Sequence, residues 1–139
     1  MTVREAEPED LPRLRAVQTV VLAEPWPELL AAGVDGPPVC LVYADPDPTG
    51  YALAVADGEA AYLAELAVAR GHRGQGQGSA LVAALVERLR DGGVRTLRVT
   101  VRAVDDRARS FYEDEEFAAT AGLPDRYESG DGLLLEREL

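Results

Sequence analysis

The sequence predicts an α/β fold in which helices cover the faces of a mixed central β-sheet. Three observations predict it: three consecutive short apolar strands, a long amphipathic helix directly after them, and a strand, a helix and two further strands that complete the chain. With 139 residues and 47% hydrophobic content, the chain can bury one core but not two. We therefore expect a single domain that spans residues 1–139.

Two helical segments are expected in the N-terminal part. Residues 7–10 are mostly acidic, and apolar residues return at helical spacing over residues 11–17. Carboxylates are favourable at the positive N-terminal end of a helix, so this order is typical of a helix start. Two prolines within residues 25–27 then interrupt the chain, and residues 28–32 permit a short second helix that ends at Gly33.

Three strands are expected next, because residues 39–43, 51–55 and 60–68 are short apolar runs. Residues 45–50 are rich in Asp, Pro and Gly and therefore predict a turn between the first two strands. The dipeptide at residues 57–58, Asp-Gly, turns the chain again into the third strand. Because both connections are short, the three strands form an antiparallel meander.

The second half of the chain begins with a helix near Ser79, whose apolar residues repeat on one face until the Asp-Gly-Gly sequence at residues 91–93 ends it. Asp105 is suited to cap a later helix. Turn-forming residues fill 122–125 and 129–132, around the last strand connection. The elements expected after the long helix are a strand, a helix and two strands, at residues 94–101, 105–112, 117–121 and 133–138.

The glycine-rich loop at residues 70–78 is the feature that points to a ligand. Three glycines alternate from Gly74 onward, so backbone N–H groups can face outward without side chains in the way. The helix that follows adds unpaired N–H groups and the positive end of its dipole, which together favour a phosphate or pyrophosphate. Arg70 and Arg73 supply mobile positive charge beside this site.

Two other phosphate-binding motifs fit this loop poorly. A kinase-type phosphate loop would need Gly-Lys-Ser or Gly-Lys-Thr at its end, and the loop contains no lysine. A dinucleotide-binding loop follows the first strand of a parallel unit, whereas this loop follows an antiparallel meander. A nicotinamide-dependent oxidoreductase is therefore a weaker interpretation of the sequence.

The loop closely resembles the signature of the GNAT acetyltransferases, in which Arg or Gln is followed, after two residues, by Gly, one residue, and Gly or Ala. Arg73, Gly76 and Gly78 match this signature. Residues 66–68 resemble the strand end that precedes it in the family, and residues 105–117 resemble a later helix motif. The chain is thus identified as a member of the family with the GNAT fold.

The resemblance implies an N-acetyltransferase that uses acetyl-CoA as its co-substrate. The family's cleft lies where the strands equivalent to residues 60–68 and 94–101 splay apart, leaving backbone groups unpaired. The backbone of residues 66–68 would hold the pantetheine arm, and residues 74–79 the pyrophosphate, with Arg73 against the phosphates. The expected cofactor-binding residues are Leu66, Ala67, Val68, Arg73, Gly74, Gln75, Gly76, Gln77, Gly78 and Ser79.

Two residues are candidates for catalysis. Tyr112 matches the family's general acid, which protonates the CoA thiolate as it leaves, and its phenol is protonated at pH 7. Glu65 is the carboxylate best placed in the sequence to serve as a base, and a water chain could serve instead. Thr100 stands where some family members that acetylate protein N-termini carry a glutamate base. His72 lies among the glycines, away from the expected thioester.

Two positions depart from the family pattern. Asp105 stands where the family usually has Asn; it can cap the helix, but its charge would repel phosphate. Glu116 stands where the family usually has Gly, and a left-handed conformation there would cost a non-glycine residue about 1 kcal/mol.

Charge and composition restrict the partners. A formal net charge of −11 argues against nucleic-acid binding and suits a cationic amine acceptor, such as a polyamine, an aminoglycoside or a basic peptide end. We expect no membrane span, no metal and a cytoplasmic location, because long apolar runs and cysteine clusters are lacking. A homodimer is a possible assembly. The alternative function is a non-catalytic module that binds acyl-CoA or another protein.

Overall fold

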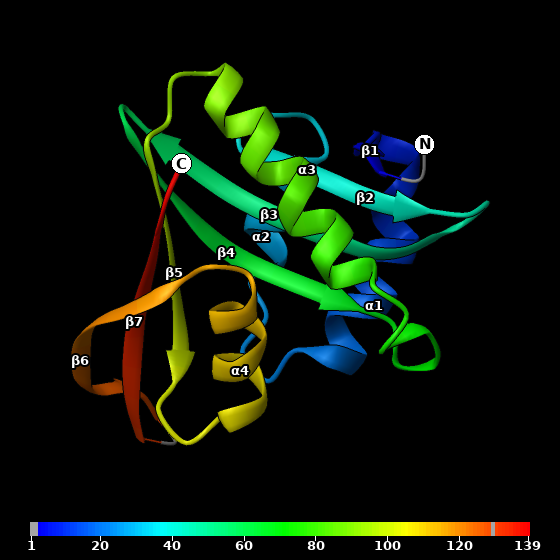
Figure 1. The fold of residues 1–139 in the computed structure, drawn as a ribbon. Helices are drawn as coiled ribbons and strands as arrows, with labels where there is room; N and C mark the ends of the chain where they lie inside the picture. The colour runs from blue at the N-terminus through cyan, green and yellow to red at the C-terminus, as the bar shows by residue number, and fades with distance from the viewer. Residues whose placement is uncertain (1–2, 129) are drawn as a thin grey trace.

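The computed structural model describes residues 3–128 and 130–139. One seven-stranded sheet runs through it, with the strand order β1-β2-β3-β4-β5-β7-β6 (Figure 1). Neighbouring strands are antiparallel except for β4 and β5, which are parallel. The strands are β1 (Val3–Glu5), β2 (Val39–Ala44), β3 (Pro48–Asp57), β4 (Ala60–Val68), β5 (Thr96–Arg102), β6 (Ala118–Tyr127) and β7 (Gly130–Glu138). The predicted mixed sheet is confirmed.

Helices cover both faces of this sheet (Figure 1). Helices α1 (Leu11–Val21) and α2 (Pro27–Gly33) lie behind it in this view, and α3 (Gln77–Asp91) and α4 (Asp106–Asp114) lie in front. The apolar residues form two clusters accordingly, one under α1 and α2 and a larger one under α3 and α4. None of the helices within the described ranges is long and apolar enough to cross a membrane.

Strand β1 was not predicted from the sequence. It has only three residues, too few to show an alternating pattern, and it forms because its backbone pairs with β2 from Val3↔Tyr43 to Glu5↔Leu41. The guanidinium of Arg4 also donates to both carboxylate oxygens of Asp10, at 2.8 and 2.9 Å. This contact lowers the pKa of Asp10 and ties β1 to the residues that precede α1.

The turn predicted at residues 122–125 is wrong, because β6 continues through it to Tyr127. Pro124 is tolerated there since β6 is the last strand of the sheet and its register with β7 shifts between Leu123 and Tyr127. The second predicted turn is shorter than expected, because β7 already begins at Gly130. Ser129, which was also placed in that turn, lies outside the described residues.

A β-bulge in β4 decides which side chains face the site. The register with β3 shifts there: Leu53 pairs with Glu65, but Ala54 pairs with Leu63, so Ala64 is the extra residue. Successive side chains of a strand point to opposite faces of the sheet, and at Ala64 this alternating order is reversed. After the bulge, Glu65 shares the α1 face of the sheet with Ala67, and the residues between and after them face the α3 side.

Strands β4 and β5 splay apart beyond the middle of the sheet. Their parallel pairing runs from Ala60↔Thr96 to Leu63↔Val99, yet β4 continues to Val68 and β5 to Arg102. Between these diverging ends, backbone groups that face the gap are free to bind a ligand. The cleft expected from the family resemblance is present.

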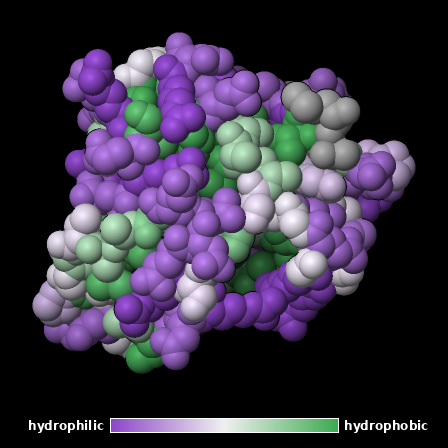
Figure 2. All heavy atoms as spheres, viewed as in Figure 1, coloured by the Kyte–Doolittle hydropathy of each residue, from purple (hydrophilic) through white to green (hydrophobic). Residues whose placement is uncertain are grey.

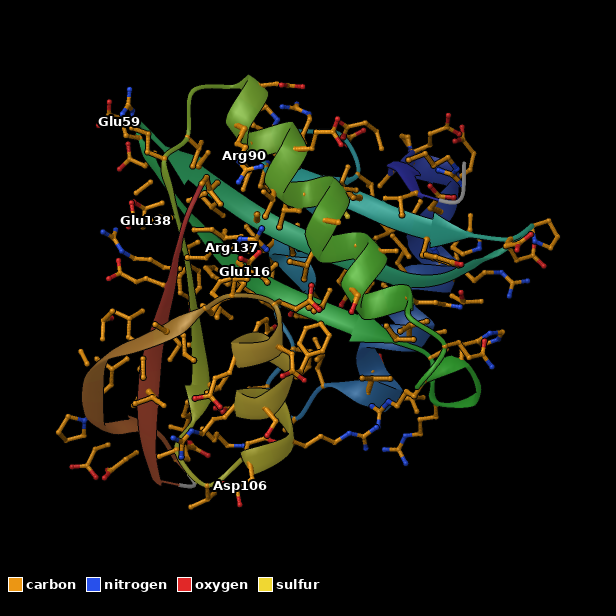
Figure 3. All side chains as sticks on the ribbon, in the orientation of Figure 1. Glu59, Arg90, Asp106, Glu116, Arg137 and Glu138 are labelled. Carbon is orange, nitrogen blue, oxygen red and sulfur yellow. The ribbon has the colours of Figure 1, made fainter. Side chains whose placement is uncertain are left out.

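Helix α4 ends in a strained conformation, and this permits a stability test. Glu116 has φ of +69°, and its carboxylate contacts Arg137 at 3.3 Å while its side chain stays 79% exposed (Figure 3). We expect Glu116→Gly to raise the free energy of unfolding by about 0.5–1 kcal/mol, because relief of strain outweighs the lost surface ion pair and the greater chain entropy of glycine. Denaturant unfolding measures this change.

The matched control for that variant is Glu113→Gly, three residues earlier and inside α4. A glycine within a helix should lower the free energy of unfolding by about 1 kcal/mol. If both variants were destabilised alike, the left-handed conformation of Glu116 would not carry the cost assigned to it.

Candidate active site

A cavity of about 560 Å³ opens where β4 and β5 diverge. Figure 2 shows it as a hollow with hydrophobic walls, beside α4 and below the N-terminal end of α3. Its volume is in the range of sites that bind small molecules. The lining residues come from the end of α1, β4, the glycine loop, the start of α3, and α4 with its N-cap: Val21, Leu22, Leu66, Val68, His72, Arg73, Gly74, Gly76, Gln77, Gly78, Ser79, Asp105, Arg107, Ala108, Phe111 and Tyr112.

The glycine loop brings the start of α3 to one end of the cavity. Helix α3 begins at Gln77, two residues before the predicted start, and Gly76 is its N-cap with φ of +81°. A Cβ atom built on Gly76 would meet no atom within 4 Å, so the space in front of the helix is open. Unpaired N–H groups at a helix start face such a space, which suits an anion.

Side-chain contacts hold the end of this loop and the start of α3 in place. Gln77 is only 6% exposed and its Oε1 accepts a hydrogen bond from the Thr49 hydroxyl at 2.8 Å. The Ser79 hydroxyl donates to the Glu115 carboxylate at 2.8 Å, which joins α3 to the end of α4. A Cβ atom on Gly78 would lie 3.2 Å from the Phe111 ring, so glycine allows α3 and α4 to approach closely.

Two arginines and one aspartate set the charge of the cavity. Arg73 lines it as expected, and Arg107 lines it from the first turn of α4. Arg70 does not, because its guanidinium donates to the Val20 carbonyl at 3.1 Å and holds the loop against α1. Asp105 lines the cavity while its carboxylate accepts from the Ala108 N–H at 3.0 Å, so its predicted helix-capping role is confirmed.

Eight of the ten expected cofactor-binding residues line the cavity, and Ala67 and Gln75 do not. Ala67 is 1% exposed and packs in the cluster under α1, because the bulge turns its side chain to that face. Its backbone still lies on the β4 segment that borders the gap. Gln75 is exposed to solvent.

Tyr112 lies at the apolar end of the cavity. Its ring is 8% exposed and packs edge-on against Phe111 and Phe117, with ring centroids 5.1 and 5.3 Å away. Burial raises the pKa of the Tyr112 phenol above its ordinary value, because the phenolate would lose its hydration. The hydroxyl therefore stays protonated at neutral pH, which is a necessary condition for the predicted role of general acid.

The structure does not bring Glu65 to the cavity. Its side chain is 6% exposed on the α1 face of the sheet, and its carboxylate accepts hydrogen bonds from Gln18, Trp26 and Tyr51. A carboxylate in this position has no route to an amine in the cavity, so the geometry does not support the predicted role of base. The sequence suggested that role because Glu65 lies in the strand that borders the cleft. The bulge at Ala64 turns its side chain to the other face of the sheet, and the residue pattern does not predict that bulge.

Seven lining residues were not among the predicted site residues: Val21, Leu22, His72, Asp105, Arg107, Ala108 and Phe111. Residues 107–111 belong to the later helix motif that carried the family resemblance, and that motif was the available signal for them. Val21 and Leu22 reach the cavity only because α1 ends beside the glycine loop, a long-range contact that local sequence patterns do not encode.

Comparisons with known proteins agree with this geometry. The sequence model of the "Acetyltransferase (GNAT) family" matches residues 3–117. A search of curated proteins found no significant match. Among solved structures, Ard1 from Thermoplasma volcanium is 27% identical, with 99% of this chain and 97% of that chain covered and a TM-score of 0.90.

Two further structures share the fold at lower identity. The ribosomal-protein-S18-alanine N-acetyltransferase from Escherichia coli is 24% identical, covers 99% of this chain and 92% of its own, and has a TM-score of 0.88. Arabidopsis thaliana NAA60 in complex with acetyl-CoA is 19% identical, with coverages of 99% and 98% and a TM-score of 0.89.

Proposed function

The chain belongs to the acetyltransferase (GNAT) family, and we propose that it transfers the acetyl group of acetyl-CoA directly to a primary amine in a ternary complex. One observation carries this proposal: a single cavity is lined by the start of α3, by β4 where it parts from β5, and by Tyr112. An acyl-CoA is a long molecule with phosphates at one end and a thioester at the other, and the cavity offers matching chemistry at each end.

The residues of the cavity fit acetyl-CoA. Its pyrophosphate would lie against the N–H groups at the start of α3, in the space that a side chain at Gly76 would fill, with Arg73 and Arg107 supplying positive charge. Leu66 and Val68 offer apolar contacts to the pantetheine arm. Backbone groups of β4 that have no partner in β5 would hydrogen-bond its amides.

The proton balance of the transfer closes with Tyr112 and water. Acetyl-CoA supplies an activated acyl carbon; the acceptor first loses its ammonium proton to water, and the neutral amine then forms the new C–N bond as the C–S bond breaks. Tyr112 donates its proton to the departing thiolate, and water returns to it the proton that the amine loses. Because Glu65 lies outside the cavity, this scheme assigns it no proton transfer.

The acceptor proposed for this site is a cationic amine. Glu24 lies in the loop between α1 and α2 and Glu28 in α2, near Trp26, whose side chain is 54% exposed. An exposed indole beside carboxylates attracts a protonated amine through charge and cation–π contact. Tyr127 is a second aromatic residue, but Arg126 already lies 5.5 Å from the centre of its ring and occupies one face.

The test of this function is thiol release from acetyl-CoA across a panel of polyamines, aminoglycosides and peptides with free N-termini. Peptides are included because a fold neighbour is named for acetylating the alanine of ribosomal protein S18. We expect micromolar binding of acetyl-CoA by calorimetry, no comparable binding of NAD, and turnover with at least one cationic amine. Tight acetyl-CoA binding without turnover on any amine would favour the non-catalytic acyl-CoA module instead.

Salt dependence tests the charge of the acceptor. Attraction between exposed charges is screened over a Debye length of about 10 Å at 0.1 M salt, so the acceptor KM should rise as ionic strength increases. The KM of acetyl-CoA is the control and should not rise in parallel, because salt also relieves repulsion between its phosphates and a protein of net charge −11. A salt-independent acceptor KM, or a neutral acceptor, would show that the acidic residues serve solubility.

A further inference from the structure

Glu65 is a buried carboxylate that the proposed chemistry does not use. One oxygen accepts hydrogen bonds from Gln18 Nε2 and the Tyr51 hydroxyl, each at 2.9 Å, and the other accepts from the Trp26 backbone N–H at 2.7 Å. Gln18 and Tyr51 are themselves 1% and 0% exposed. The three donors come from α1, β3 and the residue that precedes α2.

A buried carboxylate is costly unless its oxygens are satisfied. Within residues 3–128 and 130–139, none of the ion pairs involves Glu65, so neutral donors alone compensate its charge. Burial and the neighbouring Glu65 carboxylate raise the pKa of the Tyr51 phenol, which keeps that hydroxyl a donor. An anchor built only for stability could use an apolar side chain, so the choice of a carboxylate needs another reason.

The bond to Trp26 supplies that reason, because it holds the loop of residues 22–26 in place. This loop starts at Leu22, which lines the cavity, and ends at Trp26, whose exposed ring belongs to the proposed acceptor side. Its middle carries Glu24, one of the two acidic residues proposed to attract the acceptor. The loop therefore joins a residue that lines the cavity to an exposed ring on the proposed acceptor side.

We propose that Glu65 is a positioning residue that fixes the 22–26 loop as the acceptor-side wall of the cavity through its bond to the Trp26 N–H. The residue acts through the loop and does not touch either substrate. This inference rests on the proposed acetyltransferase function for its effect on the acceptor, whereas the anchoring of the loop can be measured without activity.

The first test is Glu65→Gln, which preserves shape but replaces one acceptor oxygen with an NH₂ group. The amide oxygen can still face Gln18 and Tyr51, which leaves the NH₂ group opposed to the Trp26 N–H, donor against donor. We expect the acceptor KM to rise at least about 10-fold, the scale of a lost hydrogen bond to a charged group, while kcat and acetyl-CoA affinity change little.

Tyr51→Phe is the matched control. It also removes one hydrogen bond from Glu65, but it leaves the bond to Trp26 intact. Both variants should lower the melting temperature, and only Glu65→Gln should raise the acceptor KM. Equal KM values in wild type and Glu65→Gln, or equal increases in both variants, would overturn the proposal. So would a Glu65→Gln variant that loses kcat and the ascending limb of the pH–rate profile, since that result identifies a general base.

A second measurement keeps the inference testable if Glu65→Gln does not fold. The Trp26 N–H should be protected from hydrogen exchange in the wild-type protein, because it is hydrogen-bonded to a buried carboxylate. Exchange at the rate of a free amide would overturn the proposal. Trp26 is the only tryptophan of the chain, so its fluorescence anisotropy reports loop motion directly, and it should fall in a folded Glu65→Gln variant.

These readouts separate the two possible failures. In the first case no amine is acetylated, while the Trp26 N–H is protected from hydrogen exchange in wild type and exchanges freely in Glu65→Gln. The proposed function and the effect on the acceptor then fail, but the anchoring of the loop by Glu65 is supported. If amines are acetylated while Glu65→Gln leaves the acceptor KM and the loop unchanged, the function stands and the inference fails.

Discussion

Replacing Gly76 with valine is expected to abolish acetyl-CoA binding. Gly76 has φ of +81° at the N-cap of α3, a conformation that a valine adopts only with strain. A valine there would also project into the open space in front of the helix, where the pyrophosphate of acetyl-CoA would lie. Both effects remove the anion site, so calorimetry should detect no binding at concentrations that saturate the wild-type protein.

Gly93→Val is the control for backbone strain. Gly93 has φ of +87°, open space around its missing Cβ, and a position just past the opposite end of the same helix. Both variants should lose a similar amount of stability, about 1–2 kcal/mol, in thermal unfolding. Only Gly76→Val should lose acetyl-CoA. Equal affinity in the two variants would show that the glycine loop is only a connector between β4 and α3.

The elements that the sequence predicted well are those with strong local patterns. Helix α3 presents one apolar face over four turns, and β4 is bounded by clear turn residues, so β4 has the predicted limits and α3 differs only in starting two residues earlier. Strand β1 forms by pairing with β2, which lies far from it in the chain, and β6 is an edge strand that forms a hairpin with β7. Their residues show no pattern of their own, which is why β1 was missed and the end of β6 was predicted as a turn.

The same distinction applies to the site. The glycine loop that lines the cavity is local, since one stretch of chain supplies the glycines, the arginine and the helix start, and sequence reasoning located it. The role of Glu65 depends instead on one extra residue in β4 and on contacts with Gln18 and Trp26, more than thirty residues away in the chain. A bulge changes the face of every later side chain in the strand, and its position follows from tertiary pairing.

Replacing Tyr112 with phenylalanine is the second change with a large expected effect. The ring would keep its edge-on contacts with Phe111 and Phe117, so the cavity and acetyl-CoA affinity should be preserved. The thiolate would then leave without a proton from the enzyme, which should lower turnover by roughly 10²-fold, the lower range for general acid catalysis. Thiol release under saturating acetyl-CoA and acceptor measures this loss.

The control for Tyr112→Phe is Tyr43→Phe, because Tyr43 packs against the same apolar cluster from β2 but does not line the cavity. It should leave turnover unchanged. The pH dependence adds a second check: a general acid must stay protonated, and since burial raises the pKa of Tyr112, wild-type turnover should not decline up to about pH 10, the ordinary value for a phenol. If Tyr112→Phe turned over as fast as the wild type, Tyr112 would serve only in packing, and the proton on the released thiol would have another source.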